Sequence, residues 1–173
     1  MADVNLSNIV AMAIAVQAPP ADESLSDNLC WLLARASQSL TVQLTEALGD
    51  LGLSPRAHCV LSTAIAGEYT QTALAQAVGL DKTTMVVTLD ELEAAGLAER
   101  RPAAGDRRAR IVAVTKAGGR KIAKSREIVE RIQTEVLASL PAREREQFVG
   151  ALARLVGERL AEPAACQASV RRR

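Results

Sequence analysis

Five arginines and one aspartate lie within the eleven residues from position 100 to position 110. A guanidinium group stays charged at physiological pH and presents a planar fork of donors that fits phosphate oxygens. The chemistry that this segment predicts is phosphate binding, although a merely solvated face is at least as good an interpretation for the first two arginines and the last. The five are Arg100, Arg101, Arg107, Arg108 and Arg110.

A second cluster of polar side chains lies earlier in the chain. Lys82, Thr83, Thr84 and Thr88 can exchange hydrogen bonds with base edges and phosphate oxygens. Val87 lies among them and can read only a thymine methyl group, by apolar contact. Both clusters therefore favour a nucleic acid as partner.

Nucleophilic and metal-binding residues are few. The cysteines Cys30, Cys59 and Cys166 are odd in number and lack Cys-x-x-Cys spacing, so we expect no disulfide framework, no zinc site and a reducing compartment. His58, the single histidine, precedes Cys59, but neighbouring residues on a helix point about 100° apart and do not form a catalytic dyad. No phosphate loop or dinucleotide-binding glycine pattern occurs. We expect no enzyme and no cofactor.

A pair of short helices positions the second cluster. Thr70 or Thr72 can cap the first helix, Gly79 suits its left-handed end, and Asp81 can cap the next helix. In that second helix Met85, Leu89 and Leu92 recur on one face and predict a buried stripe, and Gly96 ends it.

The arginines fall on a predicted β-hairpin. Two extended runs, 97–101 and 109–114, flank a segment that contains Pro102 and Gly105. A helix-turn-helix followed by an arginine-rich hairpin is typical of a winged DNA-reading domain, which we place at 51–114. Its arginines are expected to reach DNA.

The rest of the chain predicts a helical frame. One helix should run over 26–48, a second should begin at Ser54 and Pro55, and two long helices should follow Thr115 and Pro141. Apolar residues on more than one face of the two later helices indicate that these pack on a second chain as well as on their own, and we group 25–50 with 115–162 as a helical dimerisation region. We expect an extension with a short helix at 1–24, which docks or stays mobile, and a tail at 163–173.

Composition agrees with a mainly α fold that carries a small β-wing. One Trp, one Tyr and one Phe leave an aliphatic core, which suits packed helices. The net charge is only +1, which argues against an unspecific polyanion binder. However, 97–126 holds 10 basic and 2 acidic residues, whereas 20–96 holds 3 basic and 10 acidic ones. The apolar run 9–16 is too short to span a bilayer, so we expect no membrane association and a cytoplasmic protein.

The order of these residues resembles the MarR family of bacterial transcription regulators, over roughly Leu29 to Leu160. The family pattern is a Thr-Gln-x-x-Leu-Ala helix, a capped recognition helix with a Leu-x-x-x-Gly-Leu exit, an Asp-Arg-Arg wing and a Thr-x-x-Gly helix start. The matching residues here are Thr70, Gln71, Leu74, Ala75, Leu92, Gly96, Leu97, Asp106, Arg107, Arg108, Thr115 and Gly118.

The resemblance implies a homodimer that reads a pseudo-palindromic operator in double-stranded DNA. In the wing it implies that Asp106 braces the hairpin and that Arg108 enters the minor groove, whereas Arg107 either binds phosphate or forms an internal salt bridge. A repressor that a small phenolic or lipophilic effector releases is the favoured function. A winged helix that contacts protein and binds no DNA is an alternative.

Effector sensing has two candidates. Cys30 falls where the organic-hydroperoxide-sensing branch places its reactive cysteine, but the tyrosines that hold that sulfur are missing here. His58, with Trp31 and Arg35, is a candidate lining of an effector pocket or else a structural residue. Metal sensing is not expected, because a chain with one histidine cannot supply the further histidine ligands of the zinc-sensing branch.

Overall fold

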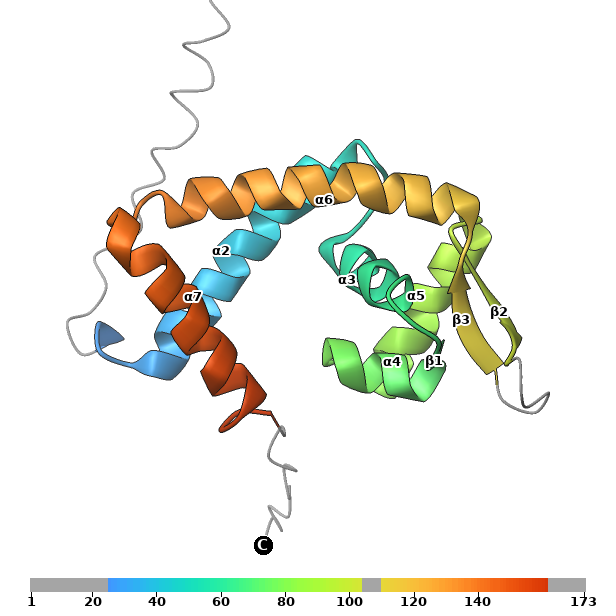
Figure 1. Cartoon of the computed structure of the whole chain (residues 1–173), viewed down its shortest axis with the longest axis horizontal. Coiled ribbons are helices and arrows are strands. Elements are labelled where there is room, and N and C mark those ends of the chain that lie inside the picture. Colours follow the sequence, from blue (N-terminus) through green and yellow to red (C-terminus); the bar gives the residue numbers. More distant parts are fainter. Residues whose placement is uncertain (1–24, 104–109, 162–173) are drawn as a thin grey trace, which may run out of the picture. The chain divides into compact units, whose positions relative to one another are not determined.

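The computed structural model describes residues 25–103 and 110–161, and the predicted N-terminal extension and C-terminal tail lie outside these ranges. The chain divides into two compact units, Met1–Val42 and Gln43–Arg173, which we describe separately. Within the described residues, helices predominate and one small antiparallel sheet is present (Figure 1). The predicted fold class is therefore confirmed.

Helix α2 spans Leu29–Gly49 and crosses from the first unit into the second. It begins three residues later than predicted, because the side chain of Asn28 accepts a hydrogen bond from the backbone N–H of Trp31 at 2.9 Å and caps the helix. Leu48 is its one buried residue, whereas Leu29, at 57% exposure, faces solvent in this single copy.

Three helices form the helix-turn-helix and its support: α3 (Pro55–Ala64), α4 (Gln71–Val78) and α5 (Lys82–Ala94). Each begins as the sequence predicts, with the side chain of Ser54, Thr70 or Asp81 accepting from a backbone N–H of the first turn. Thr70, and not Thr72, is thus the cap of α4. Gly79 ends α4 at φ +70°, in the left-handed region that an L side chain rarely adopts.

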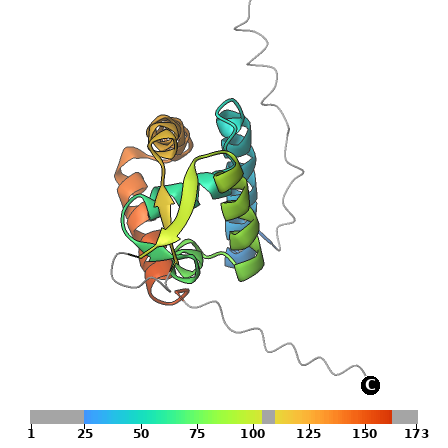
Figure 2. The ribbon, with the colours of Figure 1, turned by 90° about the vertical axis from the view of Figure 1, so that its right-hand side faces the viewer.

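The wing is a three-stranded sheet with the strand order β1-β3-β2, in which both pairs are antiparallel. β2 (Ala98–Pro102) and β3 (Arg110–Val114) form the predicted hairpin and lie side by side in Figure 2. β1 (Tyr69–Thr70) was not predicted, since two residues are too few to show an alternating pattern.

The core lies between α3, α4, α5, the sheet and the first half of α6. It is aliphatic, as composition predicts, and the stripe on α5 is fully buried, with Met85 and Leu89 at 0% and Leu92 at 3% exposure. Non-directional burial of this kind provides most of the folding free energy. The other buried members are Leu48, Leu53, Ala57, Val60, Leu61, Ala64, Leu74, Ala75, Leu97, Ala98, Val112 and Ile122.

Two helices follow the wing, α6 (Lys116–Leu137) and α7 (Ala142–Gly157). Thr115 caps α6 by accepting from the backbone N–H of Gly118 at 3.0 Å, as predicted. α7 follows Pro141, and none of its sixteen residues is buried in the single copy. An isolated helix of this length is marginal in water, so α7 needs an apolar partner.

A close contact joins the start of α6 to the end of α5. The Thr115 hydroxyl donates to the carbonyl of Gly96 at 2.8 Å, and the Thr115 N–H donates to the carbonyl of Leu97 at 3.0 Å. A Cβ atom added at Gly118 would lie 2.1 Å from the Leu97 carbonyl oxygen and 2.8 Å from Cγ1 of Val114. Only glycine allows the two backbones to approach this closely.

This contact predicts opposite effects for two neighbouring glycines of α6. Gly118→Ala should lower the free energy of unfolding by at least about 2 kcal/mol, because the new methyl group meets backbone. Gly119→Ala should raise it by up to about 1 kcal/mol, because its Cβ would lie 3.8 Å from Ile65 Cδ1, an ordinary contact, and alanine favours helix. Urea denaturation of both variants measures the difference, and equal effects would contradict this packing.

Candidate nucleic-acid interface

The exposed face of α5 carries most of the second polar cluster. Lys82 and Thr83 are exposed, and Val87 is 47% exposed. Thr84 is half-buried, and its hydroxyl donates to the Asp81 carboxylate at 2.5 Å while its backbone N–H donates to the same group at 2.9 Å. These two bonds hold the pKa of Asp81 below its usual value. The Thr84 hydroxyl therefore retains only acceptor capacity.

Thr88 does not belong to this exposed face. Its side chain is 1% exposed, and its hydroxyl donates to the Thr84 carbonyl at 2.8 Å. The expectation that Thr88 contacts DNA is therefore wrong for this fold. The reason is that Thr88 lies one turn from Thr84 and next to Leu89, on the side of α5 that packs into the core.

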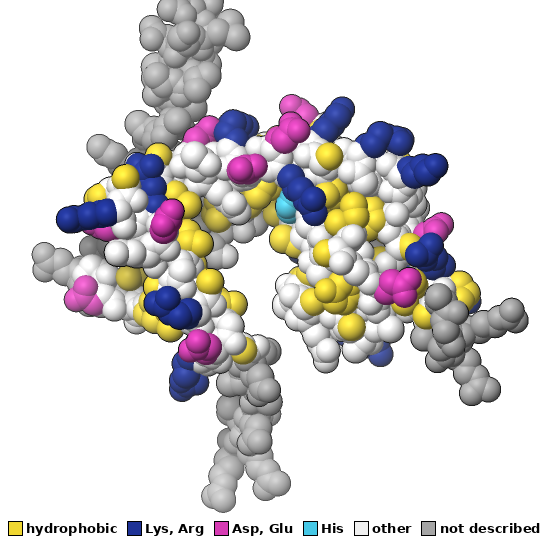
Figure 3. Space-filling view, in the orientation of Figure 1, with side chains coloured by type: hydrophobic (Ala, Val, Ile, Leu, Met, Phe, Trp, Pro, Cys, Tyr) yellow, Lys and Arg dark blue, Asp and Glu magenta, His cyan; other side chains and the backbone are white. Residues whose placement is uncertain are grey.

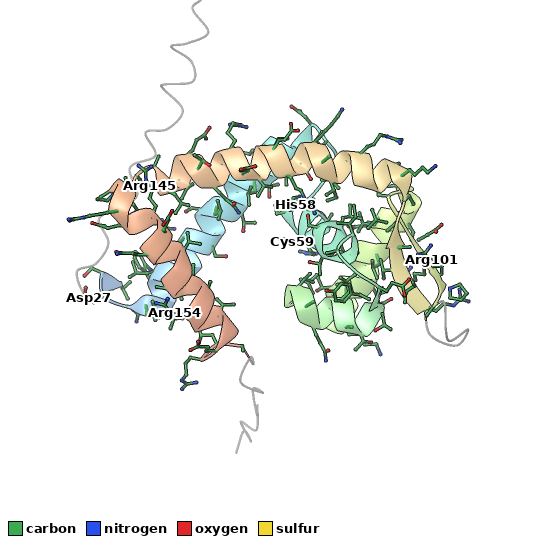
Figure 4. The ribbon with its side chains drawn as sticks, viewed as in Figure 1. Asp27, His58, Cys59, Arg101, Arg145 and Arg154 are labelled. Carbon is green, nitrogen blue, oxygen red and sulfur yellow. The ribbon has the colours of Figure 1, made fainter. Side chains whose placement is uncertain are left out.

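The wing strands place two of the arginines in solvent. Arg110 is exposed, and Arg101 is exposed beside Glu68, with a nitrogen–oxygen distance of 4.0 Å (Figure 4). Such an exposed pair contributes little to stability. Asp106, Arg107 and Arg108 lie outside the described residues, so their roles remain predictions.

Arg100 departs from the solvated face that the sequence favoured for it. Its guanidinium group binds Glu93 and Asp90 of α5, at 2.8 Å for Asp90, and Gln71 of α4 at 3.3 Å. These partners lie seven to 29 residues away in sequence, so no local pattern identified them. The hint was the acidic pair Asp90 and Glu93, which are spaced i, i+3 on one face of α5.

His58 is part of a polar contact between α3 and α6. Ser125 is fully buried and donates to the carbonyl of Ile122 at 3.0 Å, so Nδ1 of His58 donates to the Ser125 oxygen at 2.9 Å. Figure 4 shows His58 beneath α6. Burial, with a smaller effect of the Arg126 charge, lowers the pKa of His58, so the imidazole is neutral at pH 7. This supports the structural interpretation of His58.

The described cysteines, Cys30 and Cys59, are both exposed. The apolar neighbours of Cys59, Val60 and Leu61, favour a place in the core, but Cys59 itself is exposed while they are buried. Partial desolvation by neighbouring atoms raises the pKa of the Cys59 thiol, so a smaller fraction of it is present as the reactive thiolate. Cys166 lies outside the described residues.

The other predicted pocket residues, Trp31 and Arg35, lie on α2 in the first unit, with the guanidinium carbon of Arg35 6.0 Å from the indole ring centre. His58 belongs to the second unit. A pocket shared by these three residues therefore remains a prediction.

The basic charge after the wing lies on the surface of α6. Lys116, Arg120 and Lys124 follow one another at intervals of four residues and are exposed, and Figure 3 shows Lys and Arg side chains along this helix. Within the described ranges, 25–103 and 110–161, no group of His, Cys, Asp and Glu is arranged to hold a metal ion. The same residues include no helix long and apolar enough to cross a membrane.

Comparison with known proteins agrees with this geometry. The model of the MarR family matches residues 51–109. The repressor CouR bound to a 23-mer DNA duplex is 26% identical, with a TM-score of 0.73 over 80% of this chain and 99% of that one. CouR from Rhodococcus jostii bound to p-coumaroyl-CoA is 29% identical, with a TM-score of 0.70 over 82% and 96%. A probable transcriptional regulator from Pseudomonas aeruginosa is 26% identical, with a TM-score of 0.70 over 76% and 98%.

The environment of His58 predicts a pH dependence of stability. Its pKa in the folded chain lies below the usual 6.5, so below pH 6.5 the unfolded chain binds the proton more readily. Stability from His58 is complete above that pH and is lost as the pH falls toward the folded pKa. Between pH of about 7.5 and about 5.5, the wild type should therefore lose more free energy of unfolding than His58→Gln. Urea denaturation at both pH values tests this, and equal losses would disprove it.

Proposed function

We infer the function of this chain from its place in the MarR family of winged-helix, DNA-binding transcription regulators. The chain is proposed to be a cytoplasmic repressor. It binds a pseudo-palindromic operator as a homodimer and releases the operator when an effector binds. The observation that carries the proposal is the exposed N-terminal half of α5, which presents Lys82, Thr83 and Val87. A helix of this kind fits the major groove.

The exposed side chains of α5 make different kinds of contact with DNA. Lys82 neutralises a backbone phosphate, which provides affinity and makes it dependent on salt. Thr83 hydrogen-bonds a base edge or a phosphate, Thr84 accepts one bond, and Val87 contacts a thymine methyl group. The acidic residues of α5 lie toward its C-terminal half, so end-on insertion of the helix keeps them away from the phosphates.

The wing adds a second contact with the duplex. We assign Arg108 to the minor groove, Arg107 to a phosphate and Asp106 to the bracing of the hairpin. The exposure of Arg101 on β2 and Arg110 on β3 supports this assignment, as does CouR, which shares the fold and binds a 23-mer duplex. Part of the specificity then comes from groove width.

A second copy of the chain is the proposed partner of the unburied helices. The 16 residues of α7 include no buried residue, and α2 has one. We assign dimerisation to 25–50 and 115–162, which places two copies of α5 in successive major grooves. The apolar side chains available for this interface are Leu29, Leu32, Val42, Val136, Phe148, Val149, Leu155, Val156 and Leu160, all at least 40% exposed.

The effector is proposed to be a small organic molecule, and the candidate contacts are His58 of the second unit and, separately, Trp31 and Arg35 of the first unit. Support comes from CouR, which has a structure with p-coumaroyl-CoA bound. Cys30 carries a second candidate, because an exposed thiol is accessible to an organic hydroperoxide. A mobility shift before and after cumene hydroperoxide, with Cys30→Ser as control, separates the two. Release that requires Cys30 would establish the thiol switch, and binding indifferent to peroxide would exclude it.

The proposed role of Lys82 predicts a change in DNA affinity. Lys82→Ala should weaken binding to the DNA upstream of the protein's own gene and reduce the slope of log K against log salt by about one, because one phosphate contact is lost. Lys124→Ala is the matched control, since it removes the same charge from the exposed face of α6, and its slope should be unchanged. Mobility shifts from about 50 to 200 mM salt measure both slopes. Identical slopes would remove α5 from the interface.

The second prediction concerns assembly. Val149→Glu should convert the dimer to monomer, because it places a charge in the proposed apolar interface. Val87→Glu should leave the dimer intact, although Val87 and Val149 are equally exposed, at 47%. Light scattering coupled to gel filtration should give twice 18.3 kDa for the wild type and for Val87→Glu, and 18.3 kDa for Val149→Glu. A monomeric wild type would overturn the proposed dimer.

A further inference from the structure

We infer that Arg100 is a positioning residue for DNA recognition, which acts through a clamp made of Arg100, Glu93, Asp90 and Gln71. The clamp holds the reading helix α5 in one orientation against the wing and α4. The inference rests on the proposed function, because it assumes that α5 reads DNA.

Each nitrogen of the Arg100 guanidinium group donates a hydrogen bond to a protein acceptor. Nη1 donates to Glu93, Nη2 donates to Asp90 at 2.8 Å, and Nε donates to Gln71 at 3.3 Å. Every nitrogen therefore has a protein partner, and the side chain is only 25% exposed. Arg101, the next residue, is 54% exposed and has one weak ion pair. Arg100 is thus a structural link and does not serve as a phosphate ligand.

Glu93 binds the backbone of Arg100 as well as its side chain. One carboxylate oxygen accepts from the Arg100 backbone N–H at 2.7 Å, and the other accepts from the guanidinium group. β2 is an edge strand of the sheet, bonded on one side to β3, and Glu93 satisfies an N–H that would otherwise lack a partner. Both carboxylate oxygens of one helical residue therefore tie α5 to the wing.

The hydrogen bonds of the clamp restrict the orientation of α5, which its apolar face alone does not do. Burial of Met85, Leu89 and Leu92 holds the helix to the core, but apolar contact is non-directional and tolerates small rotations. Hydrogen bonds between charged groups are short and angular. Asp90 and Glu93 lie i, i+3 on one side of α5, so two anchors on one strand residue set the rotation of the helix about its axis.

The positioning role of the clamp can be tested, because it and the negative charge of Glu93 predict opposite changes in DNA affinity. Glu93 and Glu91 are both negative residues on the reading helix, where any negative charge repels phosphate. Removing either one should tighten DNA binding if charge alone matters. The side chain of Glu91 is exposed and makes no hydrogen bond or ion pair within the described part of the chain, whereas the side chain of Glu93 is the centre of the clamp. The clamp predicts opposite outcomes for the same substitution two residues apart.

The experiment compares Glu93→Ala with Glu91→Ala in the full-length protein, by mobility shift on the DNA upstream of its own gene. Glu91→Ala should bind as the wild type does or up to a few-fold tighter, and Glu93→Ala should bind about tenfold more weakly. Circular dichroism should be the same for both variants as for the wild type, which checks that each variant is folded. Binding by Glu93→Ala as tight as that by Glu91→Ala would overturn the positioning role.

A readout without DNA keeps this test separate from the proposed function. In urea denaturation, Arg100→Met and Glu93→Ala should be non-additive by about fivefold or more in the folding equilibrium constant, whereas Arg101→Met and Glu93→Ala should be additive. Amide hydrogen exchange along α5 should accelerate in Glu93→Ala and not in Glu91→Ala. Failure of the wild type to bind DNA would refute the proposed function alone. Additivity for Arg100 and Glu93 would refute the clamp.

Discussion

Burial of one face of α5 is the packing interaction around which the second unit is organised. Met85 and Leu89 are completely enclosed, and α3, α4 and the sheet all meet around them. Because that face is buried, the opposite face must be exposed, and the exposed face carries Lys82, Thr83 and Val87. The same packing that folds the domain thus determines which side chains are available to a partner.

Polar contacts add the geometry that apolar packing leaves open. Caps at Ser54, Thr70, Asp81 and Thr115 define where α3, α4, α5 and α6 begin. Gly118 permits α6 to start against the end of α5, because no side chain separates the two backbones. The Arg100 clamp and the contact of His58 with buried Ser125 then join elements that are far apart in the sequence. Each of these bonds is directional, so together they favour one arrangement over many of similar burial.

Positive and negative side chains lie on different parts of the surface. Asp90 and Glu93 of α5 are paired with Arg100, while Arg101 and Arg110 of the wing are exposed. A net charge of +1 therefore conceals separate positive and negative regions. Such an arrangement suits a protein that must be attracted to phosphate over one part of its surface only.

The helix-turn-helix, the hairpin, the aliphatic core and the resemblance to the MarR family could be derived from the sequence alone. These features depend on periodicity and on local sterics, such as the stripe through Met85 and the left-handed end at Gly79, which neighbouring residues specify. Only the folded chain showed what depends on distant partners. The Arg100 guanidinium group binds acceptors on α4 and α5, β1 pairs with β3, and Cys59 is exposed. Thr88 is buried, and its spacing of three residues from Met85 and four from Leu92 already places it on the buried face of α5. Local patterns could not specify the partners of Arg100 and β1, because those contacts join segments that become neighbours only when the chain folds.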